Sequence, residues 1–423
     1  MLKLQFTKGS TIISSINIFS KHKLKDINSC LLILIAFSIP LSVALPSLLT
    51  GVMVINWLLI ASFKDDWNTI KTNKIVLAVF FFISIHIIAL LWTNDIEHAF
   101  SYTLQKESRL LLIPFFMLYV QKRHIQYYFY AFILATTISE FASYSIIFGI
   151  IDPINGATAS NPLIFLGHIT YNPLLAIAAY LVLHSLLFSK ELSKKKQAFY
   201  ILFFSTMSIN MFLTGGRAGQ VMYLAMIVLI LLQYFEKQKL KALLLSSVFL
   251  PLLVFTFYTT SANFKNRVDS AISDIEHFGD NRNTSVGLRI NFALNSWELI
   301  KENPIFGTGT GSFRTNYARI NQIHSKEVKQ TINPHNMYTF ELVELGLLGL
   351  IGLLSIFFTQ IKYAVEMKEN SLKNFALALP LLYLLIMLSE SYLLIPSTTF
   401  LFSFFSAILY KIYNTQKVNQ DVL

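Results

Sequence analysis

The chain has 423 residues, of which 54% are hydrophobic and only 13% are charged. Soluble globular proteins carry about 25% charged residues, so this composition excludes an ordinary soluble enzyme. The formal net charge of +11 is compatible with an anionic partner such as nucleic acid until the positions of the basic residues are considered. The single cysteine, Cys30, excludes an intrachain disulfide and a cysteine-based metal site.

Long stretches without Asp, Glu, Lys or Arg divide the chain, and most are long enough to cross a bilayer as a helix of about 20 residues. They cover residues 27–63, 75–94, 110–121, 153–189, 197–216, 218–235, 242–264, 345–361, 374–389 and 391–410. We expect residues 27–63 to form a helical hairpin, because the stretch is too long for one crossing and contains two prolines. A further span at 124–151 is interrupted only by Glu140, and 153–189 is expected to supply one helix that begins near Ile169. The sequence therefore predicts about twelve transmembrane helices.

The basic residues give an orientation to this arrangement. With a cytoplasmic N-terminus, the short inside segments hold 22 Lys and Arg, and the short outside segments hold only Lys106, Arg109 and Arg217. The other nine lie in one outside loop of about 75 residues, and long loops are largely exempt from the positive-inside rule. The split predicts that both termini are cytoplasmic. It also explains the net charge by topology, so we expect no nucleic-acid partner.

These spans divide the chain into five expected segments. They are a cytoplasmic N-terminal segment (1–28), transmembrane helices 1 to 9 (29–258), a periplasmic catalytic loop (259–336), transmembrane helices 10 to 12 (337–410) and a cytoplasmic tail (411–423). The inside segments are too short to form a nucleotide site, so the chemistry is expected in the outer loop.

Two features of the outer loop are predicted from short stretches of its sequence. Residues 286–302 have the pattern of an amphipathic helix, which contains Arg289 and ends at Asn303-Pro304. Residues 304–313 then form a glycine-rich turn. We interpret it as a packed turn and not as a dinucleotide fingerprint, because no strand-helix unit surrounds it.

The sequence Asn333-Pro334-His335-Asn336 precedes an apolar helix whose N-terminus is expected to face outward. Asn333 suits an N-cap and Pro334 suits the first helical position. The free amides and the dipole of that helix end would bind an anion and would favour the neutral, proton-accepting form of His335. The alternative is a histidine that only hydrogen-bonds the cap region.

Three cations in short outside segments are candidates for ligand contacts. Arg217 lies between glycines, which allow a ligand to approach closely. The alternative is that Arg217 only anchors its helix at the membrane interface, because that role would give the same sequence pattern. Lys106 and Arg109 enter the outer end of a short helix. They contact either a ligand or a structural partner such as Glu107 or Glu140.

Two carboxylates, Glu140 and Glu390, lie within the expected spans, where carboxylates are usually functional or paired with a cation. Cations, a helix N-terminus, a neutral histidine and carboxylates are thus all expected near the outer leaflet. Cations stabilise a diphosphate leaving group, and a base activates a hydroxyl. This set fits a glycosyl transfer from a lipid diphosphate better than it fits a channel.

Three motifs of the chain resemble the O-antigen ligase family. They are Leu213-Thr-Gly-Gly-Arg-Ala218, the run 287–297 with the following Asn303-Pro-Ile-Phe-Gly-Thr-Gly309, and Pro334-His-Asn-Met-Tyr338 leading to Glu344-Leu-Gly-Leu-Leu-Gly349. The resemblance implies a polytopic all-α membrane protein with a GT-C-type glycosyltransferase fold. It also implies inverting transfer of an undecaprenyl-diphosphate-linked glycan to a sugar hydroxyl of lipid A-core, without a metal or cofactor.

The resemblance also implies roles for single residues. Arg217 and Arg289 would hold the diphosphate, and His335 would act at the acceptor hydroxyl or in the leaving-group network. Glu390 stands where a close family pattern has Asp, so its charge is kept but displaced. The residues expected to contact substrates are Arg109, Lys106, Asn336, Glu390 and Glu140.

Related functions share these motifs, namely some O-antigen polymerases and the protein O-oligosaccharyltransferases. A polymerase commonly has two sizeable outside loops, and a protein glycosyltransferase of this kind is usually longer, so the ligase is favoured. A transporter with twelve helices would instead carry charges near the midplane of the membrane, in broken helices. The expected location is the bacterial inner membrane, with a periplasmic active site and contact with membrane lipids.

Overall fold

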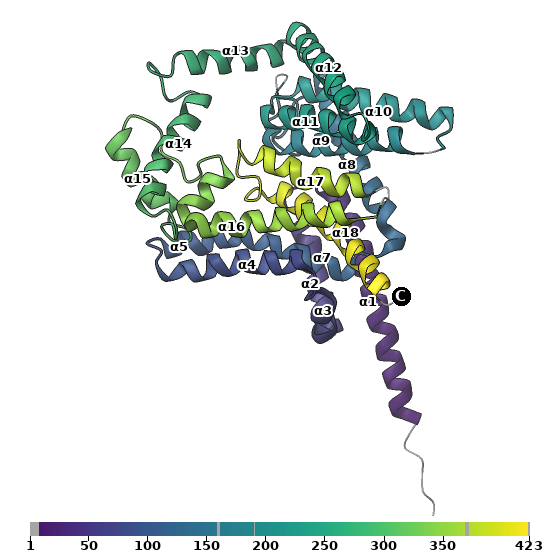
Figure 1. The fold of residues 1–423 in the computed structure, drawn as a ribbon. Coiled ribbons are helices and arrows are strands. Elements are labelled where there is room, and N and C mark those ends of the chain that lie inside the picture. The colour runs from purple at the N-terminus through teal and green to yellow at the C-terminus, as the bar shows by residue number, and fades with distance from the viewer. Residues whose placement is uncertain (1–7, 159–160, 190, 369–371, 422–423) are drawn as a thin grey trace, which may run out of the picture.

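The computed structural model describes residues 8–158, 161–189, 191–368 and 372–421, and this part of the chain is built from helices (Figure 1). The expected all-α class is confirmed for these residues, which contain no strand longer than an isolated bridge. The α-helices are α1 (Lys8–Ser38), α2 (Leu45–Ile60), α3 (Phe63–Ile70), α4 (Lys74–Ile88), α5 (Ile96–His98), α6 (Gln105–Glu107), α7 (Leu112–Tyr119), α8 (Ile125–Ile147), α9 (His168–Phe188), α10 (Lys194–Leu213), α11 (Arg217–Tyr234), α12 (Lys239–Thr260), α13 (Ala262–Glu276), α14 (Ser285–Glu302), α15 (Phe313–His324), α16 (Met337–Glu366), α17 (Lys373–Ile386) and α18 (Pro396–Asp421). Short helical segments of other types are η1 (Ala89–Leu91), η2 (Ala99–Leu104), η3 (Ser108–Leu111) and η4 (Lys122–His124).

Within the described residues, six helices are long and apolar enough to cross a membrane, or seven if the bent pair α2 and α3 forms one broken span. They run over Lys74–Leu91, Lys122–Ile147, His168–Phe188, Arg217–Tyr234, Lys239–Thr260 and Met337–Glu366. The chain is therefore a membrane protein. The count of twelve spans and the GT-C arrangement stay predictions: the other expected segments are helical, but α17, for example, has only 14 residues.

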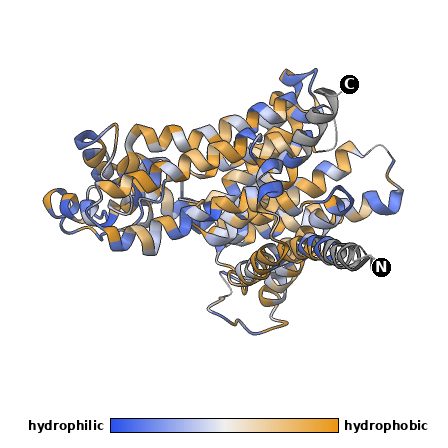
Figure 2. Cartoon of the chain, turned by 90° about the horizontal axis from the view of Figure 1, so that it is seen from below, coloured by the Kyte–Doolittle hydropathy of each residue, from blue (hydrophilic) through white to orange (hydrophobic). Residues whose placement is uncertain are grey.

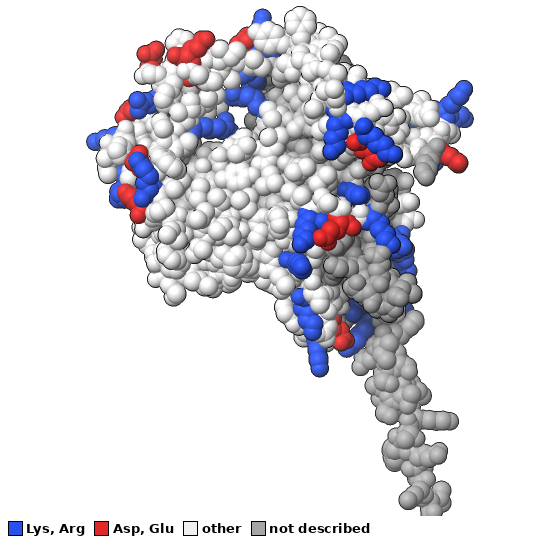
Figure 3. Space-filling model, viewed as in Figure 1, with Lys and Arg blue, Asp and Glu red and all other residues white. Residues whose placement is uncertain are grey.

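The surface is divided into an uncharged region and two charged regions, as insertion into a membrane requires. Apolar residues dominate the helices in Figure 2, with polar residues toward the helix ends and in the connections. In Figure 3 a wide uncharged flank separates two regions that carry charged side chains. Helix α12 is the most exposed of the candidate spans, with only 11% of its apolar window buried, as expected for a helix surrounded by lipid.

The N-terminal stretch forms the expected hairpin, in which α1 and α2 are joined by a turn after Ser38. Asn28 lies between the two helices: its Nδ2 donates to the carbonyl of Met53 at 3.2 Å, and its Oδ1 accepts from Asn56 Nδ2 at 2.9 Å. Polar side chains that bond across helices are a common means of association in an apolar environment.

The segment from Ile96 to Tyr119 contains Lys106 and Arg109 and is not one regular helix. It passes through α5, the π-helical η2, α6, the 3-10 helix η3 and α7. Changes of helical type are frequent at functional sites because they turn side chains away from the regular periodicity. Here they bring Lys106, Glu107 and Arg109 to different surroundings.

The outer loop is folded and attached to the bundle. Helix α14 confirms the helix expected at 286–302 and begins at Ser285, one residue earlier than predicted. Its amphipathic pattern is weaker than expected, because its buried side includes Asn291 and Asn295 while Trp297 is exposed. Helix α15 was not predicted. It is held by a bidentate ion pair from Arg314 to Asp95, with Nε to Oδ2 at 3.0 Å and Nη2 to Oδ1 at 3.1 Å. Between α14 and α15 the buried Asn295 donates to Ser325 at 2.8 Å and to Asn321 at 3.2 Å.

The glycine-rich turn is packed against the protein, as predicted. The N–H of Gly309 donates to the carbonyl of Glu344 at 2.8 Å, and the N–H of Gly311 donates to the Glu344 carboxylate at 2.8 Å. His98 Nδ1 lies 3.0 Å from the carbonyl of Gly311, so this nitrogen carries the proton. Burial lowers the pKa of His98, which keeps the ring in the neutral form. The turn thus packs against α16 at Glu344, next to the break in the helix at Gly346, where φ is 63°.

Gly311→Ala is expected to destabilise the protein by about 2 kcal/mol or more, because both space and backbone conformation oppose a side chain. A Cβ at Gly311 would lie 2.3 Å from Ala99 Cα, and the residue has a φ of +80°. Thermal unfolding of the purified protein measures the effect. Gly279→Ala is the matched control, since a Cβ there meets nothing within 4 Å. Equal melting temperatures for the two variants would show that the turn is not packed as described.

Candidate functional site

His335 and Glu390 form a close pair. His335 Nδ1 lies 2.6 Å from Glu390 Oε2, and the two side chains are 37% and 6% exposed. The other carboxylate oxygen, Oε1, accepts the N–H of Ser391 at 3.0 Å, which fixes the carboxylate. When the imidazole is neutral, Nδ1–H donates to Glu390 and Nε2 keeps its lone pair. The pair therefore presents a proton-accepting nitrogen on a ring that is partly accessible.

The backbone before α16 directs this ring. His335 has a φ of 55°, in the left-handed region that residues other than glycine seldom adopt. Its N–H donates to Asn333 Oδ1 at 2.8 Å, and the same oxygen accepts from Ser391 Oγ at 2.8 Å. The ring of Phe292, on α14, stacks on the imidazole with centroids 5.9 Å apart. A strained residue held on several sides is a common sign of a functional position.

The predicted helix cap is wrong by three residues. Helix α16 begins at Met337 and its N-cap is Asn336, whose Oδ1 accepts from the N–H of Thr339 at 3.0 Å. The N–H of Met337 donates to the carbonyl of Met387 at 2.9 Å, so two of the first amides are used within the protein. Asn336 Nδ2 also donates to the carbonyl of Leu388 at 3.0 Å, which gives Asn336 a structural role. Asn333 forms the turn around His335 instead of the cap.

Arg217 and Arg289 converge on one hydroxyl. Arg217 is the first residue of α11, and its Nη2 lies 3.2 Å from Ser285 Oγ. Arg289 Nη1 lies 3.4 Å from the same oxygen, one turn further along α14. Neither arginine has an ion pair among the described residues, and Arg289 Nε is buried without a hydrogen-bond partner. Two guanidinium groups that share a hydroxyl without a carboxylate leave donors available for an anion.

A third arginine, Arg267 of α13, was missed by the sequence reasoning. Its Nη2 lies 3.1 Å from the position that a Cβ of Gly215 would occupy, so the glycine allows it to reach the loop before Arg217. The charges of Arg217, Arg267 and Arg289 all act on His168 at the start of α9. In Figure 3, basic side chains gather below α13. We call Arg217, Arg267 and Arg289 the arginine group.

The sequence contained a signal for Arg267. Phe264, three residues earlier, is buried and packs edge-on against Phe212 with centroids 5.2 Å apart. Residues three apart lie on the same side of a helix, so an apolar anchor directs Arg267 toward the bundle. This signal was weak, because nine basic residues share the outer loop and only tertiary contacts distinguish them.

The arginine group and the His335 pair lie near each other and form one candidate site. Phe292, which stacks on His335, lies three residues after Arg289 on α14. The charges of the Glu390 carboxylate and of the Arg289 guanidinium both act on the Tyr392 hydroxyl. The buried hydroxyl of Tyr392 has no hydrogen-bond partner among the described residues.

Lys106 also reaches this site. Its Nζ lies 3.4 Å from the centroid of the Tyr102 ring, and Tyr102 lies beside Asn333. The charge of Glu390 acts on Lys106 as well. A cation over an aromatic ring keeps part of its charge available to a ligand.

Arg109 and Glu140 are placed differently. Arg109 forms no ion pair with Glu107 or Glu140 in the described structure, although the charge of Glu107 acts on it, and its Nη1 is buried without a partner. Glu140 is fully buried, and its neighbours are Tyr144, Tyr171 and other residues of α8, α9 and α10. No contact among the described residues joins Glu140 to the His335 pair or to the arginine group.

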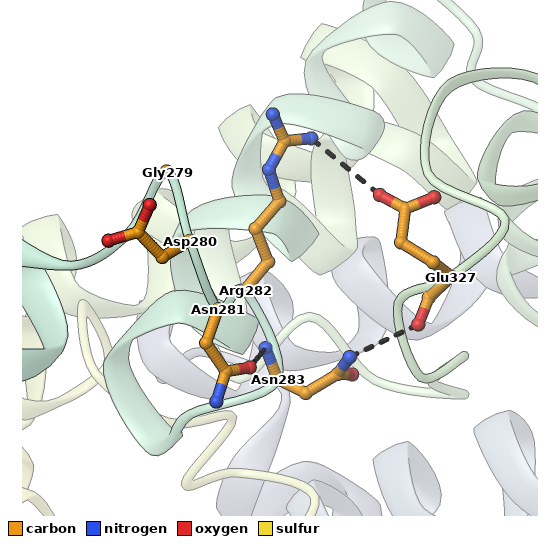
Figure 4. Close-up of a pocket in the computed structure, with 6 residues that line it drawn as sticks. All are labelled: Gly279, Asp280, Asn281, Arg282, Asn283 and Glu327. Carbon is orange, nitrogen blue, oxygen red and sulfur yellow. Dashed lines mark hydrogen bonds and ion pairs between the residues drawn. The ribbon is translucent and has the colours of Figure 1, made fainter.

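A separate hollow of about 250 Å³ lies at the turn between α13 and α14 (Figure 4). Its walls include Arg282 and Glu327, whose Nη1 and Oε1 atoms are 4.0 Å apart. Asn283 Nδ2 donates to the carbonyl of Glu327 at 3.1 Å. None of the residues predicted to act on substrate lines this hollow, so we do not assign the site to it.

Comparison with known proteins supports the resemblance seen in the motifs. Residues 202–354 match the family model for O-antigen ligases, and this range includes Arg217, Arg267, Arg289 and His335. The chain is also 31% identical, over 162 residues, to an uncharacterized protein of Haemophilus influenzae. That match covers 36% of this chain and 40% of the relative, so the chain spans less than half of the length of the curated relative.

Proposed function

We propose that this membrane protein, as a member of the O-antigen ligase family, transfers a glycan from undecaprenyl diphosphate to a sugar hydroxyl of lipid A-core. The reaction belongs to lipopolysaccharide biosynthesis and takes place at the periplasmic face of the bacterial inner membrane. The observation that supports it most is the arginine group, which forms no ion pair among the described residues although the charge of Asp274 acts on Arg217, near a histidine that lies 2.6 Å from Glu390. An anion site next to a base is what a diphosphate leaving group and a hydroxyl acceptor require.

The arginine group binds the diphosphate in this proposal. Guanidinium groups donate paired hydrogen bonds to phosphate oxygens, and their charge stabilises the leaving group as the glycosidic bond breaks. Three arginines supply about three positive charges against the diphosphate. The transfer is therefore assigned to side chains, without a metal or cofactor.

His335 activates the acceptor. The acceptor oxygen attacks the anomeric carbon, the bond from that carbon to the phosphate oxygen breaks, and undecaprenyl diphosphate leaves. Nε2 of His335 takes the hydroxyl proton, and Glu390 stabilises the charge that develops on the imidazole. Attack from the face opposite the diphosphate inverts the anomeric configuration.

The other predicted substrate contacts differ in their support. Lys106 lies beside the His335 pair and is assigned to a phosphate or sugar hydroxyl of either substrate. Arg109 has a buried, unpartnered nitrogen, and we assign it to the same side of the site. Asn336 supports the backbone of His335, and Glu140 has the least support because of its position among α8, α9 and α10.

The proposed topology places both termini in the cytoplasm, transmembrane helices 1 to 9 within residues 29–258, helices 10 to 12 within residues 337–410, and residues 259–336 in the periplasm. The distribution of basic residues supports it, and so do α13, α14 and α15, which form the folded outer loop. Reporter fusions after residues 70, 190 and 280 test it, with a periplasmic signal expected only for the last.

Two related activities are the alternatives, an O-antigen polymerase and a protein O-oligosaccharyltransferase. The single sizeable outer loop favours the ligase. A transporter with twelve helices is a remote alternative, since the charged site lies near the helix ends and not within broken helices at the midplane.

A lipopolysaccharide gel of a deletion strain distinguishes the first two functions. Loss of a ligase leaves lipid A-core without polymer while lipid-linked polymer accumulates. Loss of a polymerase leaves core that carries single repeat units. Purified protein with lipid-linked donor and core acceptor tests transfer directly, and solute uptake into vesicles without any transfer would refute the proposal.

A further inference from the structure

A cluster of buried ionisable groups lies apart from the arginine group. It consists of His86 near the end of α4, Glu107 in α6 and Glu341 in α16. Each of the three residues is 0% exposed. One side-chain ligand atom from each residue lies within 4.8 Å of the other two. Three elements far apart in the sequence thus direct polar groups at one point.

Among the described residues, the polar atoms of this cluster have no hydrogen-bond partner outside the cluster. This holds for both ring nitrogens of His86 and for all four carboxylate oxygens of Glu107 and Glu341, whose carboxyl groups face each other. His86 Nε2 approaches Glu341 Oε2 only to 3.5 Å. Buried polar groups in proteins almost always have a partner, so six such atoms in one place require an explanation.

Among the described residues, no lysine or arginine forms an ion pair with either of the two carboxylates. The charges of Arg109 and Lys106 act on Glu107, but neither side chain forms an ion pair with it among the described residues. The neighbouring Glu344 already accepts from the N–H groups of Gly311 and Phe313. The Phe82 ring closes another side, with its centroid 4.8 Å from that of His86. Two carboxylates facing one another without a counterion are strongly unfavourable in such a place.

We propose that His86, Glu107 and Glu341 bind one first-row divalent cation such as Zn²⁺ or Mn²⁺. One imidazole and two carboxylates are ligands that these ions accept, and the two carboxylates balance the charge of the ion. The unpartnered nitrogen of His86, aimed at the carboxylates, distinguishes this cluster from a simple group of acidic residues.

The cation has a structural role. It ties α4 and α6 to α16 at Glu341, four residues after the start of that helix and six after His335. No contact among the described residues joins its three ligands to the arginine group, so we route no step of the transfer through the ion. Because the ligands are fully enclosed, exchange of the ion with solvent is expected to be slow.

Metal analysis of the full-length protein, purified in detergent without added metal or chelator, tests the proposal and requires no glycan transfer. About one equivalent of a first-row metal per chain is expected, falling at least about tenfold in Glu107→Gln and Glu341→Gln. Glu140→Gln, which removes another buried and unpartnered carboxylate outside the cluster, is the control that keeps the metal.

A measurement on the wild-type protein covers the case in which the variants fail to fold. Protein in which Co²⁺ replaces the native metal should show the absorption spectrum of an ion with one nitrogen ligand and several oxygen ligands. X-ray absorption spectroscopy should detect one imidazole ligand. Wild-type protein without stoichiometric metal would overturn the proposal. So would an infrared band of a protonated carboxylic acid that disappears in Glu341→Gln, because the carboxylates would then share a proton.

Discussion

Arg289→Ala is expected to abolish glycan transfer, with a loss of about a thousandfold or more in kcat/KM. Arg289 lies in α14 with its Nη1 3.4 Å from Ser285 Oγ, next to Arg217 on the same hydroxyl. In the proposed site the variant removes a hydrogen-bond donor to the leaving-group diphosphate, whose negative charge increases in the transition state. Turnover of lipid-linked donor by purified protein measures the effect.

The same variant should not destabilise the fold. Arg289 has no ion pair among the described residues and stands close to Arg217, so its removal relieves repulsion between like charges. We therefore expect an unchanged or higher melting temperature together with the loss of activity. Arg282→Ala, at the hollow between α13 and α14, is the matched control with near-normal transfer.

Graded substitutions distinguish an anion site from a packing role. Arg289→Lys keeps the charge but loses the planar fork, so it should retain a small part of the activity. Arg267→Ala should weaken donor binding by about tenfold, since its guanidinium extends toward Gly215 near Arg217. Pyrophosphate should raise the melting temperature of the wild type and should do so less in Arg289→Ala. Transfer by Arg289→Ala within about tenfold of the wild type would contradict the assigned role.

The sequence alone predicted those elements whose signal is local. Stretches without charged residues located the helices. Helix α9, for example, begins at His168, one residue before the expected start at Ile169. Helix α14 was found from its apolar periodicity and from Asn303-Pro304 at its end. The glycine turn was identified as packing, because no strand-helix unit surrounded it.

Features that depend on tertiary contacts could not be predicted. Asn333 and Asn336 are three residues apart and both suit an N-cap. The structure selects the second, where the N–H of Met337 donates to the carbonyl of Met387. Glu390 is 55 residues from His335, so their pairing follows from how the turn after α17 meets the start of α16. The sequence singled out both residues but did not join them.

The buried cluster at His86 also depends on tertiary contacts that the sequence does not show. From the sequence, Glu107 is expected only as a partner for Lys106 or Arg109, because these residues are its close neighbours in the chain. In the structure its carboxylate faces Glu341, more than 200 residues away, from a segment that changes helical type between Ile96 and Tyr119.

His335→Ala is expected to reduce transfer by about a hundredfold to ten-thousandfold, the range for loss of a general base. In the proposed mechanism the imidazole accepts the proton of the attacking hydroxyl at Nε2, while Nδ1 stays hydrogen-bonded to Glu390, which lies 2.6 Å away. Membrane levels should stay normal, since the ring is 37% exposed and packs mainly on Phe292. Initial rates with lipid-linked donor and core acceptor give the change in kcat.

His335→Asn separates the base from the backbone. His335 has a φ of 55°, and asparagine adopts this region more easily than most residues, so the variant preserves the turn while it removes the imidazole. Added imidazole should restore part of the activity of His335→Ala if the ring acts as a base. Glu390→Gln should lose less, about tenfold to a hundredfold, because its amide oxygen still accepts from Nδ1 but no longer stabilises a charged ring. If His335→Asn kept near-wild-type kcat, the acceptor proton would have to go elsewhere, and Glu390 would be a packing residue and not the partner of a base.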